Sequence, residues 1–208
     1  LITTKKADKD KVSIEYNGSF TLGSQLAKWD NIQTTYGMGD NGEYQLDASS
    51  GTNQSWGAKA DEINKTYFDG SVHPVYMYAN NAADFFRTGL TAQNTAVLSV
   101  NSGKTGIRFS MTDTRNRNIL PNTDRNRDNF NLRVNTSVGP VDFDLSANYT
   151  HEGVNNRPAL GDSQSNVGKN LMTLASTYNQ KWLKNYQNAD GTYANWNGND
   201  QYNKNPYW

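Results

Sequence analysis

The sequence contains no cysteine, so it has neither a disulfide framework nor a thiolate metal site. It also has no run approaching the roughly 20 consecutive apolar residues that a membrane-spanning helix needs. Its formal net charge is zero, and the basic residues near Lys5 and between 115 and 127 are interspersed with Asp and Asn. A nucleic-acid-binding surface is therefore not expected, because such a surface is strongly basic.

Histidine is scarce as well, with only His73 and His151 in the chain. A Ser–His–Asp site needs a marked nucleophile, and no Gly-x-Ser-x-Gly turn is present. We therefore expect no enzyme activity, no catalytic residue and no cofactor. Asp40, Glu43 and Asp47 carry the oxygen ligands that calcium takes. The spacing of an EF-hand is absent, which favours a solvated turn over a metal site.

The apolar residues that are present follow a period of two in five segments. Hydrophobic residues make up only 35% of the chain, a low fraction beside the about 45–50% of globular domains, which is counted with Gly and without Tyr. The five segments are residues 12–20, 94–100, 105–113, 129–138 and 141–150. Successive side chains of a strand point to opposite faces, so each segment has one apolar and one polar face. This pattern predicts an all-β chain and is typical of transmembrane β-barrels, whose strands cross the bilayer with roughly 9–11 residues.

The alternation assigns strand side chains to two environments. The residues expected to face lipid are Ile14, Tyr16, Phe109, Phe130, Leu132, Phe143, Leu145 and Tyr149. The residues expected to face the barrel lumen are Glu15, Arg108, Arg133, Asp142 and Asp144. A slip of one residue would turn these charges toward lipid, where an Arg near the bilayer midplane costs about 2–4 kcal/mol. The register is therefore tightly specified.

The connections between the segments alternate between long and short. Long connections are expected at about 21–89, 114–128 and 151–208, and tight turns at 101–104 and 139–140. Outer-membrane barrels have long extracellular loops and short periplasmic turns, so the three long connections are expected outside the cell. In the last of them, Leu171, Leu174, Tyr178 and Trp182 recur at helical spacing and predict one short helix, capped by Ser163 or Asn166.

The tryptophans all lie outside the five segments. We consider Trp29, Trp56, Trp182 and Trp196 as candidate ligand-binding residues, because flat rings stack on sugars and neighbouring amides donate hydrogen bonds. The alternative is that these rings pack the loops onto each other or onto a partner protein that covers the barrel.

Short motifs along nearly the whole chain resemble, in their order and spacing, those of the SusC-like TonB-dependent outer-membrane transporters of Bacteroidetes. The motifs are residues 1–6 (LITTKK), 36–39 (YGMG), 55–57 (SWG), 84–89 (DFFRTG), 121–123 (PNT), 129–133 (NFNLR), 157–162 (RPALGD) and 205–208 (NPYW). One departure is Ala7-Asp8, where the family usually has Gly after the two lysines.

The resemblance implies a partial transmembrane antiparallel β-barrel, the first five strands of roughly 22. It implies that residues 1–6 end a plug domain, that 7–11 form a linker, and that 12–208 begin the barrel. The implied partners are a SusD-like lipoprotein, TonB acting through an N-terminal segment, the protein's own plug, and the lipid or lipopolysaccharide of the membrane. Because five strands cannot close a barrel, we expect the chain to be part of a longer protein.

The function implied by the resemblance is TonB-dependent active import of a bulky oligosaccharide or peptide across the outer membrane of a Gram-negative bacterium. Two other functions fit the β-rich pattern. One is a non-transporting surface ligand-binding protein or adhesin, which salt rather than detergent would release. The other is an outer-membrane enzyme of the small-barrel type, which would need a catalytic triad on strands outside this sequence.

Overall fold

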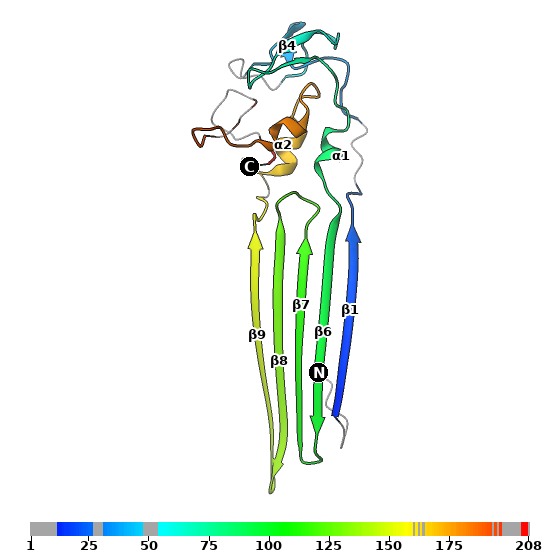
Figure 1. Cartoon of the computed structure of the whole chain (residues 1–208), viewed down its shortest axis with the longest axis vertical. Coiled ribbons are helices and arrows are strands. Elements are labelled where there is room, and N and C mark those ends of the chain that lie inside the picture. Colours follow the sequence, from blue (N-terminus) through cyan, green and yellow to red (C-terminus); the bar gives the residue numbers. More distant parts are fainter. Residues whose placement is uncertain are drawn as a thin grey trace. The chain divides into compact units, whose positions relative to one another are not determined.

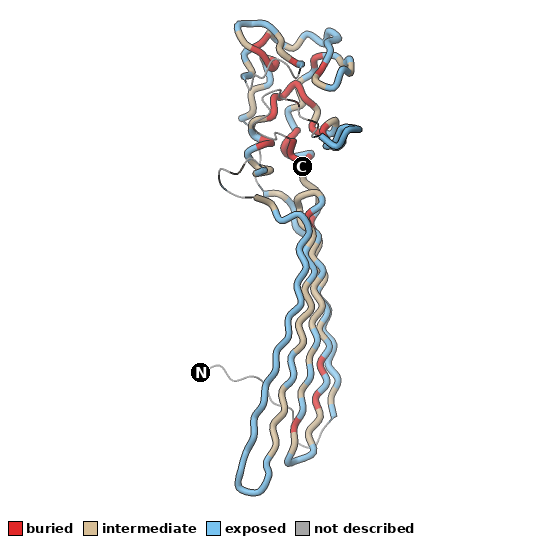
Figure 2. The backbone as a smooth tube through the Cα atoms, turned by 90° about the vertical axis from the view of Figure 1, so that its left-hand side faces the viewer, coloured by how far each residue is buried: buried red, intermediate tan, exposed pale blue. Residues whose placement is uncertain are grey.

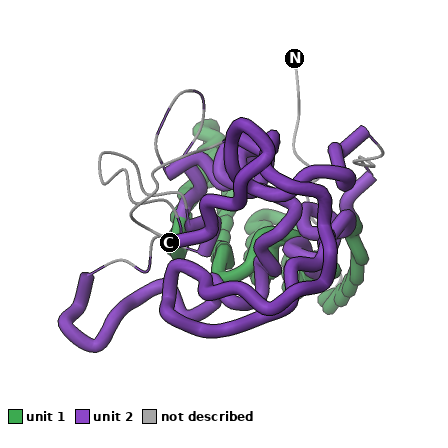
Figure 3. The backbone as a smooth tube through the Cα atoms, turned by 90° about the horizontal axis from the view of Figure 1, so that it is seen from above, with its two compact units in different colours: residues 1–24, 88–156 green, residues 25–87, 157–208 purple. Residues whose placement is uncertain are grey.

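The computed structural model describes residues 12–26, 31–47, 54–159, 161, 163, 165–192, 194, 196 and 205–207. The chain divides into two compact units, which Figure 3 colours separately. We call residues 1–24 and 88–156 the strand unit, and residues 25–87 and 157–208 the loop unit. The expected plug end at 1–6 and the linker at 7–11 lie outside the described residues.

The strand unit is a single antiparallel sheet of five strands (Figure 1). The strands are β1 (Val12–Gly23), β6 (Gly89–Asn101), β7 (Thr105–Arg117), β8 (Asp124–Val138) and β9 (Val141–Asn155). Their spatial order is β1-β6-β7-β8-β9, so β1 and β9 form the two edges. All five segments predicted from the alternation are confirmed as strands. The sheet is not closed, and the chain is mostly β-structure.

At one end of the sheet the strands run further than the apolar alternation predicted. β1 runs to Gly23, β6 begins at Gly89 and β9 runs to Asn155, so the connections expected at about 21–89 and 151–208 begin only after residues 23 and 155. β7 continues to Arg117 and β8 begins at Asp124, so the connection expected at 114–128 is reduced to residues 118–123. The added stretches of β7 and β8 are polar and are held by the ladder and by cross-strand ion pairs, such as Arg125 with Glu152 at 2.8 Å. Alternation of apolar and polar residues therefore predicts a strand only where one of its faces is apolar. It does not detect strand segments that have two polar faces.

Tight hairpin turns join the strands at the other end of the sheet. β6 and β7 are connected by residues 102–104, and β8 and β9 by residues 139–140. Gly103 (φ 80°) and Gly139 (φ 61°) occupy the left-handed region in these turns, where glycine has no steric penalty. Both predicted turns are confirmed.

The loop unit contains short elements around one hydrophobic core. β2 (Gly39–Asp40) pairs with β3 (Glu43–Tyr44), and β4 (Asn64–Thr66) pairs with β5 (Val72–Pro74). The helices are α1 (Asn81–Phe85), α2 (Val167–Thr173) and the 3₁₀ helix η1 (Gln180–Lys184). Figure 2 shows the buried residues of this unit in red; the core is formed by Met38, Leu46, Tyr67, Val75, Leu174, Ala175, Tyr178, Leu183 and Trp196.

Two connections that are separated in sequence by four strands fold together in this unit. The Met38 amide donates to Thr177 Oγ1 (3.3 Å), and Ser176 Oγ donates to the Gln33 carbonyl (2.7 Å). The Gln180 amide donates to Asn81 Oδ1 (3.0 Å), and both groups are buried. The sequence suggested packing of the loops onto each other only as one alternative for the tryptophans and did not identify the residues of this common core.

The single helix expected to carry Leu171, Leu174, Tyr178 and Trp182 is wrong in its extent. α2 ends at Thr173, Leu174 has an extended backbone, and Trp182 belongs to η1. The residues between these helices hydrogen-bond to the first long connection instead of continuing the helix. Asn166 caps α2, its side chain accepting from the Lys169 amide at 3.3 Å. No helix in the described part of the chain is long and apolar enough to cross a membrane.

Candidate functional site

The register of the sheet sorts the strand side chains into two faces, because partners in adjacent antiparallel strands share a face. We call one the apolar face. It is formed by Val12, Ile14 and Tyr16 on β1, Ala96, Leu98 and Val100 on β6, Ile107, Phe109 and Met111 on β7, Phe130, Leu132 and Val134 on β8, and Phe143, Leu145, Ala147 and Tyr149 on β9. The opposite face, the polar face, carries Ser, Thr, Asn, Gln, Arg and acidic side chains at almost every position.

The register places the sequence-predicted residues consistently. All eight residues expected to contact lipid belong to the apolar face. Glu15, Arg108, Arg133, Asp142 and Asp144 all belong to the polar face. Contact of the first set with lipid, and of the second with a lumen, stays a prediction.

The apolar face is a large exposed hydrophobic surface. Ile14 is 79% exposed, Leu145 64% and Phe143 55%. Contiguous apolar patches of this kind mark membrane or protein contacts. From Val141 to Tyr149 the face extends over eight steps of about 3.4 Å, or about 27 Å along the strand. The apolar band on the outer wall of a membrane barrel is about 25 Å tall.

An aromatic row ends the continuous part of the apolar face, although Phe20 and Leu22 of β1 continue on the same side beyond the next row and are 66% and 64% exposed. Tyr16, Phe130 and Tyr149 lie in this row, and the Tyr16 hydroxyl donates to Asn94 Oδ1 at 2.6 Å. Amphipathic rings of this kind suit the boundary between hydrocarbon and water. The next row is polar and holds Asn94 and Asp128.

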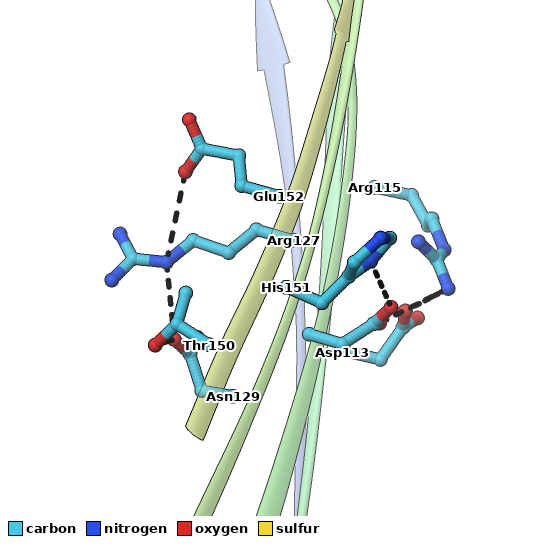
Figure 4. Close-up of polar contacts among 8 residues, drawn as sticks. Asp113, Arg115, Arg127, Asn129, Thr150, His151 and Glu152 are labelled. Atoms are coloured by element: carbon cyan, nitrogen blue, oxygen red, sulfur yellow. Dashed lines mark hydrogen bonds and ion pairs between the residues drawn. The ribbon is translucent and has the colours of Figure 1, made fainter. Parts of the chain in front are cut away.

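An ion-pair cluster occupies this polar row on the side of the apolar face (Figure 4). Asp113 and Asp128 lie directly opposite each other on β7 and β8, an arrangement in which like charges repel. Arg115 Nη2 contacts Asp113 at 2.5 Å and Asp128 at 3.1 Å, and His151 Nδ1 lies 3.8 Å from Asp128. The change from aromatic to charged side chains therefore occurs within one row of the sheet.

The predicted lumen residues on the polar face form local pairs near the hairpin end. Arg133 binds Asp144 with two parallel hydrogen bonds, Nε to Oδ1 at 2.9 Å and Nη2 to Oδ2 at 2.5 Å. Arg108 Nη1 donates to Ser99 Oγ at 2.9 Å. Ser137 Oγ donates to Asp142 Oδ1 at 2.6 Å.

Near the other end, the polar face contains a hollow of about 690 Å³. All ten side chains that line it can form hydrogen bonds: two arginines, Arg125 and Arg127, and eight Thr, Asn or Gln residues contributed by β6, β7, β8 and β9. No apolar or aromatic residue is among them. This hollow is the most distinctive polar site in the described part of the strand unit.

The hydrogen bonds in the hollow fix its side chains. Asn129 Oδ1 accepts from Arg127 Nε at 3.1 Å and from Thr150 Oγ1 at 3.0 Å. Glu152 Oε2 accepts from Arg125 Nη2 at 2.8 Å and lies 3.9 Å from Arg127 Nε. Sequence reasoning missed this site because it assigned residues 114–128 to a loop. The available signal was the period of two among polar residues that continues from Arg125 to Arg133.

The candidate tryptophans occupy different environments in the loop unit. Trp196 is fully buried and packs on Tyr178, with ring centroids 5.3 Å apart. Trp182 stacks on His73 at 4.2 Å with an interplanar angle of 13°. Trp56 is 63% exposed and Trp29 lies outside the described residues. These positions favour the packing alternative for Trp196 and Trp182, while Trp56 presents an open ring.

The carboxylates considered for calcium lie around a turn. Asp40 Oδ1 accepts a hydrogen bond from the Asn41 amide at 2.8 Å, and Glu43 follows in β3. Within the described residues, no three His, Asp or Glu side chains gather in a way that could hold a metal ion.

Comparison of the chain with models of known protein families finds no match. Comparison with curated proteins finds no match either.

Proposed function

We propose that this chain forms part of the wall of a transmembrane β-barrel that imports a bulky oligosaccharide or peptide across the outer membrane. One observation carries the proposal. A sheet with one exposed apolar face, bordered by an aromatic row, has an opposite face that is polar at almost every position. In a water-filled or plug-filled barrel, this arrangement puts apolar side chains against lipid and polar ones inside.

The connections support the same proposal. The residues between β1 and β6, and those after β9, leave the same end of the sheet and fold into a unit with its own core. Tight turns join the strands at the other end. Long external segments and short internal turns are the usual arrangement in outer-membrane barrels, and a folded external unit offers a surface for a SusD-like lipoprotein. Energy for import would come from TonB through the plug.

Neighbouring residues on β9 provide a sharp test of the membrane assignment. The chain has no cysteine, so Leu145→Cys and Asp144→Cys each introduce a single thiol into it. In liposomes holding the complete protein, we expect the thiol at 145 to be protected from a water-soluble maleimide and the thiol at 144 to be labelled. Equal labelling of the two variants in intact liposomes would contradict the proposal.

A second measurement addresses transport and partner together. Purification of the complete protein in detergent is expected to bring a SusD-like lipoprotein with it, and uptake is expected to stop when TonB is deleted. A protein released from cells by salt alone would instead support a surface-binding protein or adhesin.

A further inference from the structure

We infer that the hollow on the polar face binds an anionic group of a hydroxyl-rich ligand, which makes an acidic oligosaccharide the preferred cargo. The inference rests on the proposed function, since it takes the polar face as the wall of the import path. It narrows that function, because peptides and neutral sugars fit the hollow less well.

The described side chains that line the hollow are all polar or charged. Hydroxyl, amide and guanidinium groups line the hollow, and no ring or aliphatic side chain does. Sites for apolar side chains are lined mainly by hydrophobic and aromatic residues. The hollow therefore offers many hydrogen bonds to a polyhydroxylated ligand, and its described lining includes no apolar or aromatic residue on which a peptide side chain could pack.

The charged groups in and beside the hollow favour an anionic ligand. Among the described residues that line the hollow, only Arg125 and Arg127 are charged. The nearby Asp124 and Asp128 alternate with them along β8 and belong to the other face. Glu152 lies beside the hollow and accepts from Arg125 at 2.8 Å. Two guanidinium groups against one carboxylate leave the site with an excess of positive charge.

The orientation of Arg127 leaves its terminal amino groups available to a ligand. Its Nε is held by Asn129 at 3.1 Å and lies 3.9 Å from Glu152. Figure 4 shows that its two terminal amino groups point away from both partners and from the sheet. No described residue pairs with these amino groups. A guanidinium held by Nε presents its remaining donors as a fixed fork, which matches the two oxygens of a carboxylate or sulfate.

Binding of two tetrasaccharides to the complete protein in detergent tests the inference. The probes are tetragalacturonate, which is acidic, and maltotetraose, which is neutral, both titrated by calorimetry at low salt. We expect tetragalacturonate to bind at least tenfold more tightly, and Arg127→Gln to weaken it by about tenfold or more, because hydrogen bonds to charged groups are strong. The neutral probe should be unaffected by this substitution.

Two further variants separate the site from general charge effects. Glu152→Gln removes the carboxylate that is paired with Arg125. Because Arg125 then has no acidic partner at this position, the variant is expected to bind tetragalacturonate more tightly. Arg133→Gln is the matched control. Arg133 lies on the same face of the same strand, outside the hollow, and is bound to Asp144. It should leave the affinity unchanged.

Equal affinity for the two probes, or equal loss in Arg127→Gln and Arg133→Gln, would overturn the inference. The inference would also be overturned if tetragalacturonate did not bind and Arg127→Gln lowered the melting temperature of the protein. Those two results together would show that another part of the protein occupies the hollow and pairs with Arg127. These outcomes are distinct from failure of the proposed function, which thiol labelling and TonB-dependent uptake report independently of any acidic ligand.

Discussion

Gly39 and Gly42 both have positive φ angles, but their surroundings differ. At Gly39 (φ 148°) an added Cβ would lie 1.9 Å from the Glu43 carbonyl oxygen, whereas at Gly42 (φ 81°) nothing lies within 4 Å. We expect Gly42→Ala to cost about 1 kcal/mol of loop-unit stability through the left-handed backbone alone. Gly39→Ala should cost more than about 3 kcal/mol, because the backbone must move.

Hydrogen exchange of the backbone amides in residues 37–47, followed by mass spectrometry in the complete protein, measures this difference. Gly39→Ala should accelerate exchange across the whole segment, and Gly42→Ala only near its own turn. Similar exchange in the two variants would show that the close approach to Glu43 is relieved at little cost.

Partly buried tyrosines in the loop unit predict a loss of stability at high pH. Burial raises the pKa of Tyr207 to about 12, and burial together with the charge of Asp61 raises the pKa of Tyr44 to about 12. The unfolded value is about 10. A raised pKa in the folded state means that the stabilisation is fully present below pH 10 and is lost as the pH rises from 10 to 12.

Unfolding followed by denaturant at several pH values, with tyrosinate absorbance as a second signal, measures this loss. In Tyr207→Phe, which cannot ionise, the decline between pH 10 and 12 should be shallower than in the unchanged protein. Parallel curves for the two proteins would contradict the assignment to Tyr207.

At the scale of elements, the sequence predicted the strands well wherever one of their faces is apolar. Residues such as Phe109, Leu132 and Leu145 alternate with polar neighbours, and a period of two is the pattern of a strand with one apolar face. The same signal disappears where both faces are polar. Residues 114–117 and 124–128 were therefore assigned to a loop, although ladder hydrogen bonds and ion pairs extend the sheet through them.

The helix in the last connection failed as a prediction for a different reason. Leu174 and Tyr178 have the spacing of a helical stripe, and both are indeed buried. They pack in one core with residues from the first long connection, including Met38 and Leu46. A contact between segments more than 100 residues apart leaves no local periodicity, so neither the helix end at Thr173 nor the common core could be predicted from the sequence. The hollow was missed because Thr114, Asn116, Arg125 and Arg127, which line it, fall within the stretch assigned to a loop.

At the scale of the whole molecule, the two units are stabilised differently. The loop unit has a buried core with Trp196, Tyr178 and Leu183 fully enclosed. The strand unit has few buried apolar side chains and is held by its ladder and by cross-strand polar pairs. Five strands with an exposed apolar face and open edges are poorly suited to water alone. In the proposed barrel, lipid covers this face and further strands cover the edges.

This difference gives a prediction that compares the two faces of one strand. Phe109 lies in the middle of the apolar face, between Leu98 and Leu132, and Ser110 is its neighbour on the polar face. We expect Phe109→Arg to lower the free energy of unfolding of the complete protein in liposomes by about 2–4 kcal/mol, since an Arg near the bilayer midplane costs this much. Ser110→Arg should change it by less than about 1 kcal/mol, because a polar interior can solvate the added charge.

Urea titration in liposomes, with the heat-modifiable gel mobility of barrels as the folding signal, measures both values. If Ser110→Arg proved as costly as Phe109→Arg, or if Phe109→Arg were tolerated, the apolar face would not be in contact with lipid, and the polar face would lose its assignment as the wall of an import path.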